Sequence, residues 1–206
     1  MAQYWIGRSY FMLGDYKRAA EAFETAVGLD PGNSDLHHWL GKSFGRRAET
    51  ANPLSAPGLA SKARQQFEKA VELDPRNISA AGDLMEYYME APGFLGGGLN
   101  KAEALAEKIK AVDPAEYHFA IAQLAEQRKD SRRAEENFRR AVELAPQQVA
   151  RILDLGRFLA KQGRFQESEQ VFEQAEKVDP NEPRILFERA NAYIRAKKNL
   201  DTAKTL

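Results

Sequence analysis

The chain has 206 residues, of which 43% are hydrophobic and 29% are charged, and this balance is typical of a folded protein rather than a disordered one. Lysine and arginine together number 30, as do aspartate and glutamate, so the net charge is zero and the basic excess typical of nucleic-acid binding is missing. The absence of cysteine excludes disulfides, zinc fingers and thiol catalysis, and no apolar run approaches the ~20 residues of a membrane-spanning helix.

One phrase recurs along the chain, and each copy predicts a helix. In the first copy Ala19, Phe23 and Ala26 are spaced i, i+4 and i+7, which places them on one face of a helix. The proline that closes each copy ends the helix, because proline disfavours helical geometry in the residue before it. The copies span residues 19–31, 63–75, 102–114, 134–146 and 168–180.

A second amphipathic stretch precedes each phrase and predicts the first helix of a hairpin. Residues 4–13 form one such stretch, followed by Gly14, and residues 151–161 form another, followed by Gly163. Glycine suits the left-handed conformation that often closes a helix. A single hairpin cannot bury its apolar face alone, so neighbouring hairpins must stack.

These hairpins resemble the repeats of the tetratricopeptide family, whose period of 34 residues separates Pro146 from Pro180. The residues that carry the resemblance in the fifth repeat are Leu155, Gly156, Leu159, Gly163, Phe165, Ser168, Phe172, Ala175 and Pro180, and in the first repeat they are Ile6, Gly7, Tyr10, Gly14, Tyr16, Ala19, Phe23, Ala26 and Pro31. The resemblance implies an all-α fold, a right-handed α-solenoid of antiparallel helix pairs, in which the first helix of each pair lines a concave groove. Small residues occur where the two helices of a pair meet, because a bulky side chain would force them apart; they are Gly7, Gly41, Ala122, Gly156 and Ala190.

Six repeats are predicted, and the last is incomplete. Their bounds are 1–33, 34–77, 78–114, 115–148, 149–182 and 183–206. The chain begins inside a repeat and stops early in a helix, so we expect an excised fragment of a longer protein.

Two of the repeats carry insertions. In the second repeat the insertion lies at about residues 47–59, where two prolines and a glycine predict a turn rather than a helix, with Leu54 and Leu59 against the solenoid. In the third repeat it lies at about residues 91–100. We expect the two loops to lie side by side as a candidate second docking surface. Such consecutive long turns resemble a bacterial subgroup of the family.

No catalytic or metal-binding pattern stands out. The glycines at 96–98 precede Lys101, but a phosphate-binding loop would need Gly-Lys-Ser/Thr at its end, so we interpret them as a flexible turn capped by Asn100. The adjacent His37 and His38 point about 100° apart on a helix and cannot easily share a metal. We therefore expect no enzyme activity, no metal and no cofactor.

The resemblance implies which residues of the first helices face the concave groove. They are Tyr4, Arg8, Met12, His38, Trp39, Lys42, Arg46, Asp83, Glu86, Glu90, Gln123, Arg157, Lys161, Asn191 and Arg195. The first two repeats are basic and aromatic here, the third is acidic and the last two are mostly basic. A partner segment with an acidic part facing the first two repeats and a basic part facing the third would be complementary. The alternative for Trp5 and Trp39 is that they pack between repeats as core.

Some members of the family hold a C-terminal carboxylate with a clamp of lysine, arginine and asparagine residues. Here Tyr4, Arg8 and Trp39 stand at the places that need a cation and two asparagines, and Ser79 and Asp83 stand where lysine and arginine belong. The clamp is broken, so chaperone C-termini of that type are not the expected ligand.

The sequence therefore predicts a non-catalytic scaffold that binds a peptide or protein segment in its groove and supports assembly of a multiprotein complex. The alternative is an accessory domain of a larger enzyme, secretion or envelope-assembly protein whose activity lies outside these residues. The expected partner is a protein or peptide, with no nucleic acid and no membrane span, and the compartment stays open between cytoplasm and periplasm. Self-association through the incomplete sixth repeat is also expected, since Leu186, Ala190 and Tyr193 would be poorly covered there.

Overall fold

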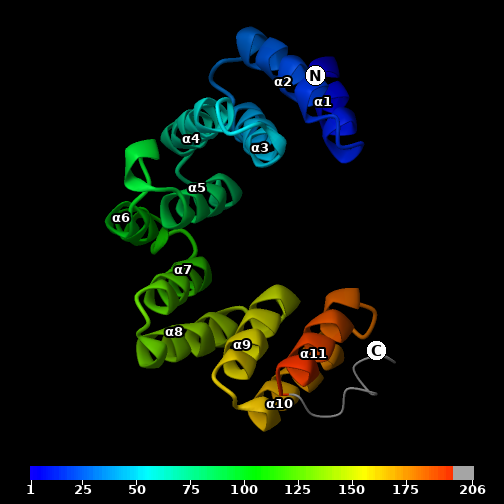
Figure 1. The fold of residues 1–206 in the computed structure, drawn as a ribbon, viewed down its shortest axis with the longest axis vertical. Coiled ribbons are helices and arrows are strands. Elements are labelled where there is room, and N and C mark those ends of the chain that lie inside the picture. The colour runs from blue at the N-terminus through cyan, green and yellow to red at the C-terminus, as the bar shows by residue number, and fades with distance from the viewer. Residues whose placement is uncertain (197–206) are drawn as a thin grey trace. The chain divides into compact units, whose positions relative to one another are not determined.

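The computed structural model describes residues 1–196, and all regular structure in that range is helical, which confirms the all-α class. Consecutive helices pair into hairpins, as Figure 1 shows. The elements are α1 (Ala2–Met12), α2 (Tyr16–Leu29), α3 (Ser34–Thr50), α4 (Ala56–Leu73), α5 (Ile78–Glu90), η1 (Gly93–Leu95), α6 (Leu99–Ile109), α7 (Pro114–Gln127), α8 (Ser131–Leu144), α9 (Val149–Lys161), α10 (Phe165–Val178) and α11 (Pro183–Ala196).

The hairpins form two compact units, each with its own stack. Unit 1 is Met1–Asp113 and contains α1 to α6, and unit 2 begins at Pro114 and contains α7 to α11. In unit 1, α3 packs on α2 and α5 on α4, and in unit 2, α9 packs on α8 and α11 on both α9 and α10. The first helices of the hairpins lie on one side of their unit and the second helices on the other (Figure 1). Each unit is thus a short solenoid.

Glycine allows the two helices of a pair to approach closely. A Cβ atom added to Gly41 would lie 2.6 Å from Phe67 Cδ1, and one added to Gly156 would lie 2.5 Å from Phe172 Cε1. Such distances are too short for any real Cβ contact. The predicted role of these two glycines at the helix crossing is confirmed, because the aromatic ring of the second helix fills the space where a side chain would be.

The helix ends follow the expected local chemistry, with one exception. Gly14 and Gly163, which follow α1 and α9, take φ values of 77° and 79° in the left-handed region. Lys129, which follows α7, takes the same conformation with φ 61° although it is not glycine. The next residue, Asp130, begins α8 by accepting a hydrogen bond from the backbone N–H of Arg133, a typical N-cap.

The insertion of the second repeat is mostly helical, so the prediction of a turn across residues 47–59 is wrong. Helix α3 continues to Thr50 and α4 begins at Ala56, which leaves only residues 51–55 between them. Pro57 is tolerated because it lies in the first turn of α4, where its missing N–H has no intrahelical acceptor. The extra residues therefore lengthen the hairpin. Leu54 is 96% exposed, which contradicts its predicted packing, whereas Leu59 is half-buried.

The insertion of the third repeat is a turn, but it is fixed by hydrogen bonds rather than flexible. The Tyr87 hydroxyl donates to the carbonyl oxygen of Leu95 at 2.9 Å, and the Gly98 N–H donates to the carbonyl oxygen of Tyr88 at 2.7 Å. A Cβ atom on Gly97 would lie 1.8 Å from a backbone oxygen, so only glycine fits there. Helix α6 begins after Gly98, and the predicted capping by Asn100 is wrong because that residue is already inside the helix.

Candidate partner-binding site

An aromatic cluster lines the exposed side of α1 and α3, which together with α5 forms what we call the inner face of unit 1. Trp39 stacks on Phe23 with ring centroids 6.0 Å apart and meets Phe11 edge-on at 5.3 Å. Trp39 is half-buried, so it joins the first two hairpins as core. Trp5 is 58% exposed and touches Tyr4 edge-on at 5.1 Å. The two tryptophans therefore differ: one holds the hairpins together and the other faces solvent.

The guanidinium group of Arg8 lies among these rings. Its central carbon is 4.5 Å from the ring centroid of Trp39 and 5.7 Å from those of Tyr4 and Trp5, distances typical of cation–π interactions. Nη1 donates a hydrogen bond of 3.2 Å to the Tyr4 hydroxyl, and the buried Nε has no acceptor. Within residues 1–196 no carboxylate lies at ion-pair distance from Arg8. The positive charge is held in place by aromatic rings and is not neutralised.

Two further predicted groove residues, His38 and Lys42, converge on Asp83 of α5. His38 Nε2 lies 2.7 Å from Asp83 Oδ2, and Lys42 Nζ lies 3.7 Å from the same oxygen. His38 is only 5% exposed, so it forms part of the wall beneath the inner face and does not face the groove as predicted. His37 is also buried, between Gln66 and the carbonyl oxygen of Pro31. The two histidines thus stabilise packing.

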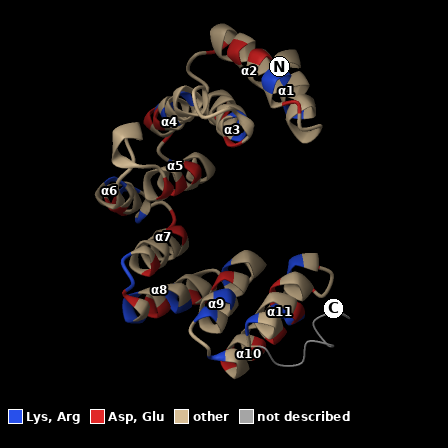
Figure 2. Cartoon of the chain, in the orientation of Figure 1, with Lys and Arg blue, Asp and Glu red and all other residues tan. Residues whose placement is uncertain are grey.

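An acidic cleft of about 290 Å³ continues the inner face from α3 to α5. Helix α5 contains Asp83, Glu86 and Glu90 but no lysine or arginine, and its ribbon is coloured red at acidic positions in Figure 2. Burial, followed by the nearby carboxylates of Glu90 and Asp83, raises the pKa of Glu86. Arg46 is paired with Glu49 at 2.7 Å, and no cation within the described residues pairs with Glu86 or Glu90. This end of the inner face carries unmatched negative charge.

On the corresponding face of unit 2, along α7, α9 and α11, the charged residues of α9 are paired within the chain. Arg157 Nη2 donates to Asp154 Oδ1 at 2.6 Å, and Lys161 Nζ donates to Glu126 Oε1 at 2.7 Å. Burial raises the pKa of Asp154, although the neighbouring arginines oppose this shift. The predicted basic groove residues of the fifth repeat are therefore neutralised rather than available.

An ion pair that the sequence reasoning missed lies deeper in the same face. Arg151 of α9 pairs with Glu116 of α7, which is only 8% exposed. The guanidinium carbon of Arg151 lies 3.7 Å from the ring centroid of Phe119. Glu116 and Arg151 are 35 residues apart, as are Glu126 and Lys161. Opposite charges about one repeat apart are the sequence signal that could have revealed both pairs.

The remaining predicted groove residues are scattered. Met12 is 78% exposed at the end of α1, Gln123 and Asn191 are half-buried, and Arg195 is exposed in the last turn of α11. The predicted self-association surface also lies on α11, where Leu186 is 43% exposed. The rest of the sixth repeat, residues 197–206, lies outside the described residues, and self-association stays a prediction.

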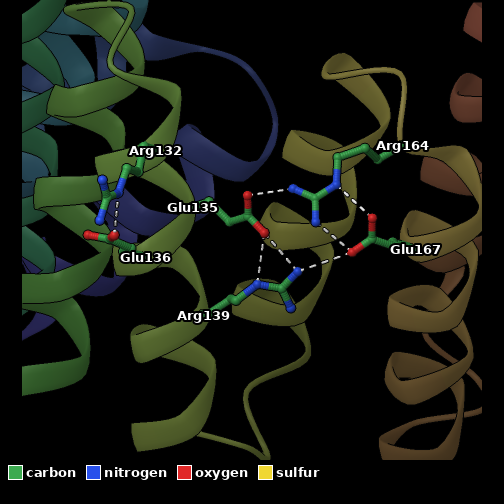
Figure 3. A network of polar contacts seen from close by, with 6 residues as sticks. All are labelled: Arg132, Glu135, Glu136, Arg139, Arg164 and Glu167. Atoms are coloured by element: carbon green, nitrogen blue, oxygen red, sulfur yellow. Dashed lines mark hydrogen bonds and ion pairs between the residues drawn. The ribbon is translucent and has the colours of Figure 1, made fainter.

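On the opposite side of unit 2, α8 and α10 are joined by a network of four charged side chains (Figure 3). Glu135 accepts hydrogen bonds from Arg164 and from Arg139, and Glu167 accepts from Arg164 at 2.6 and 2.7 Å. The hydrogen bonds from Arg164, more than any other cause, lower the pKa of both carboxyl groups. This network links the fourth and fifth repeats.

Neither a metal centre nor a membrane span was found in the part of the chain that the structure describes. No group of three or more histidine, aspartate or glutamate residues there is arranged to hold a metal ion. No helix there is both long and apolar enough to cross a bilayer.

The paired helices, the glycine–phenylalanine crossings and the stacking of hairpins define a helical-repeat protein. Family models described as tetratricopeptide repeat match residues 1–33 and 125–186. These two parts of the chain therefore contain tetratricopeptide repeats, as the sequence pattern predicted. The likeness to a bacterial subgroup of that family stays a prediction.

Solved structures share the fold at low sequence identity. The thermophilic tetratricopeptide repeat protein TTC0263 from Thermus thermophilus is 20% identical, with 94% of this chain and 98% of that chain covered and a TM-score of 0.71. PilF from Pseudomonas aeruginosa is 19% identical, with 99% and 86% covered and a TM-score of 0.64. Yeast Tom70 is 18% identical, with 92% and 37% covered and a TM-score of 0.63. No curated protein matches the chain.

Proposed function

We propose that the protein is a non-catalytic scaffold that binds a segment of another protein on the inner face of unit 1 and so supports assembly of a multiprotein complex. The tetratricopeptide repeats support a protein-interaction role in general. One observation favours this face in particular: it carries an unmatched cation on α1 and unmatched carboxylates on α5, whereas the basic groove residues predicted in the fifth repeat are paired.

The inner face of unit 1 also has the residue types that anchor interfaces. Tryptophan, tyrosine and arginine contribute most of the binding energy in many protein complexes, and Tyr4, Trp5 and Arg8 occur together here. Charge complementarity then orients the bound segment, with its acidic part over α1 and its basic part in the cleft beside Glu86 and Glu90. The inner face of unit 1 therefore has side chains that can anchor a partner and opposite charges at its two ends that can orient it.

Affinity capture from the native host, followed by mass spectrometry, tests this proposal. Two variants reverse the charge at the two ends of the face, Arg8→Glu and the double substitution Glu86→Lys with Glu90→Lys. The matched control is Arg132→Glu, whose side chain is 91% exposed on α8. We expect the same partners to be lost from both inner-face variants and kept by the control, with helical circular dichroism unchanged. Retention of those partners by both variants would refute the proposal.

The second candidate function is that of an accessory domain within a larger protein. The observation that favours it is that this chain matches yeast Tom70 over 92% of its own length but over only 37% of Tom70. A fold of this size thus occurs as part of a longer chain. Sequencing the uninterrupted reading frame tests this candidate: an adjoining catalytic or membrane segment would support it, and immediate stop codons on both sides would dismiss it.

A further inference from the structure

We propose that Arg8 binds a single carboxylate of the partner, an aspartate or glutamate side chain, and that exposed Trp5 packs against an apolar residue beside it. This inference rests on the proposed function, because it names the chemistry of the segment that binds to the inner face. It follows from the contacts of Arg8, from the charges around it and from the exposure of Trp5.

Arg8 differs from the arginines on the corresponding face of unit 2. There Arg151 pairs with Glu116 and Asp154, and Arg157 pairs with Asp154. Arg8 has a hydrogen bond to a neutral tyrosine and three aromatic rings around it, but no carboxylate within the described residues. The rings hold the guanidinium group without satisfying its charge or most of its N–H donors. A partner carboxylate would supply the missing acceptor.

The surroundings favour a carboxylate over a phosphate group. A phosphate carries nearly two negative charges at neutral pH and is usually bound by a cluster of arginines. Here the neighbouring cation, Lys42, lies over the ring of Trp39 and is 3.7 Å from Asp83, so it is already paired. One guanidinium group with a planar fork of donors matches one carboxylate.

The exposure of Trp5 is the reason to expect an apolar residue beside the partner's carboxylate. Trp5 is 58% exposed, and its ring centroid lies 5.7 Å from the guanidinium carbon of Arg8. An apolar side chain that covers this ring would also exclude water from the adjacent ion pair, and an ion pair is stronger when it is shielded from water. We therefore expect the partner's acidic residue to lie next to a large apolar residue.

Tryptophan fluorescence can report binding at Arg8. The chain contains two tryptophans, and both contact Arg8, so all tryptophan fluorescence of the protein comes from this cluster. The test titrates the full chain with three pools of end-capped decapeptides, in which a central Glu-Phe, Gln-Phe or phosphoserine-Phe pair is flanked by random alanine, serine, glycine and glutamine. End-capping removes terminal carboxylates, and an uncapped Gln-Phe pool is a fourth arm.

We expect the Glu-Phe pool to change the fluorescence and to bind about tenfold to a hundredfold more tightly than the Gln-Phe pool, as for other charge-assisted hydrogen bonds. Arg8→Gln should abolish that preference, and Arg8→Lys should reduce it. The matched control is Arg18→Gln, because Arg18 also lies over a tyrosine ring, at 5.6 Å, but on α2 and 3.6 Å from Asp15. This control should keep the full preference.

Several results would overturn the inference. Equal binding of the Glu-Phe and Gln-Phe pools to the wild-type protein would do so, as would a preference that survives Arg8→Gln or the absence of any fluorescence change. Tighter binding of the phosphoserine pool, or of the uncapped Gln-Phe pool, would assign the site to a phosphate or to a chain terminus instead. In each case the proposed function still stands if the capture experiment shows partners lost from the inner-face variants.

Discussion

Two glycines of α3 separate the effect of close helix packing from that of helix propensity. Gly41 and Gly45 are four residues apart in the same helix and face the same partner, α4. Replacing glycine by alanine in a helix interior stabilises it by about 1 kcal/mol. At Gly45 the new Cβ would find its nearest neighbour at 4.0 Å, an ordinary contact. At Gly41 it would lie 2.6 Å from two ring atoms of Phe67 and 3.2 Å from the Ala63 carbonyl oxygen.

The clash at Gly41 is expected to outweigh the gain in propensity. Overpacking a filled core costs ~1–3 kcal/mol, and Phe67 is only 6% exposed, so its ring has little freedom to move. Gly45→Ala should therefore stabilise the protein by ~1 kcal/mol, and Gly41→Ala should be less stable than Gly45→Ala by ~1–3 kcal/mol. The propensity term cancels in that difference, which isolates the packing cost.

Thermal unfolding followed by circular dichroism measures both variants. For a chain of this size a change of ~1 kcal/mol shifts the melting temperature by ~2–4 °C. The double variant Gly41→Ala with Phe67→Leu should be more stable than the sum of its single changes by ~0.5–3 kcal/mol, because the smaller side chain makes room for the new methyl group. If Gly41→Ala stabilises the protein as much as Gly45→Ala, the close approach at this crossing does not exist.

Three further measurements test other features of the structure. Lys129→Gly should raise stability by ~1 kcal/mol in urea unfolding, because the residue there has positive φ. Glu86→Gln should stabilise the protein by ~0.2–0.5 kcal/mol at pH 7 by removing repulsion from Glu90 four residues on. The pKa of Glu86 is raised in the folded protein, so protonation of Glu86 favours folding, and this stabilisation is lost as pH rises through that pKa. At acid pH Glu86 is already protonated, so the stability gained by Glu86→Gln should vanish in urea unfolding there. Carbon-detected NMR should show that the hydrogen bonds from Arg184 lower the pKa of Glu182 to about 2, and Arg184→Gln should return it toward its usual value.

Local sequence pattern was sufficient to predict the helix pairs. The apolar spacing of residues 19–31 and its copies gave the second helices, and the small residues gave the crossings, because both depend on contacts within one hairpin. Local pattern was insufficient at the insertion of the second repeat, where Pro57 fits either a turn or the first turn of a helix. In the extended hairpin Phe44 of α3 is 3% exposed and Lys62 of α4 lies over its ring at 5.3 Å, contacts that the local pattern of the insertion does not contain.

The sequence by itself determined the repeat, the helices and the positions of charged residues on the first helices. Only the tertiary structure decided which of those charges are free. Lys161 of α9 meets a carboxylate of α7, His38 is buried against Asp83 of α5, and Arg8 lies among aromatic rings. The physical reason is that an ion pair depends on distances of a few ångströms between side chains of different helices, and repeat position fixes a residue's face but not its partner.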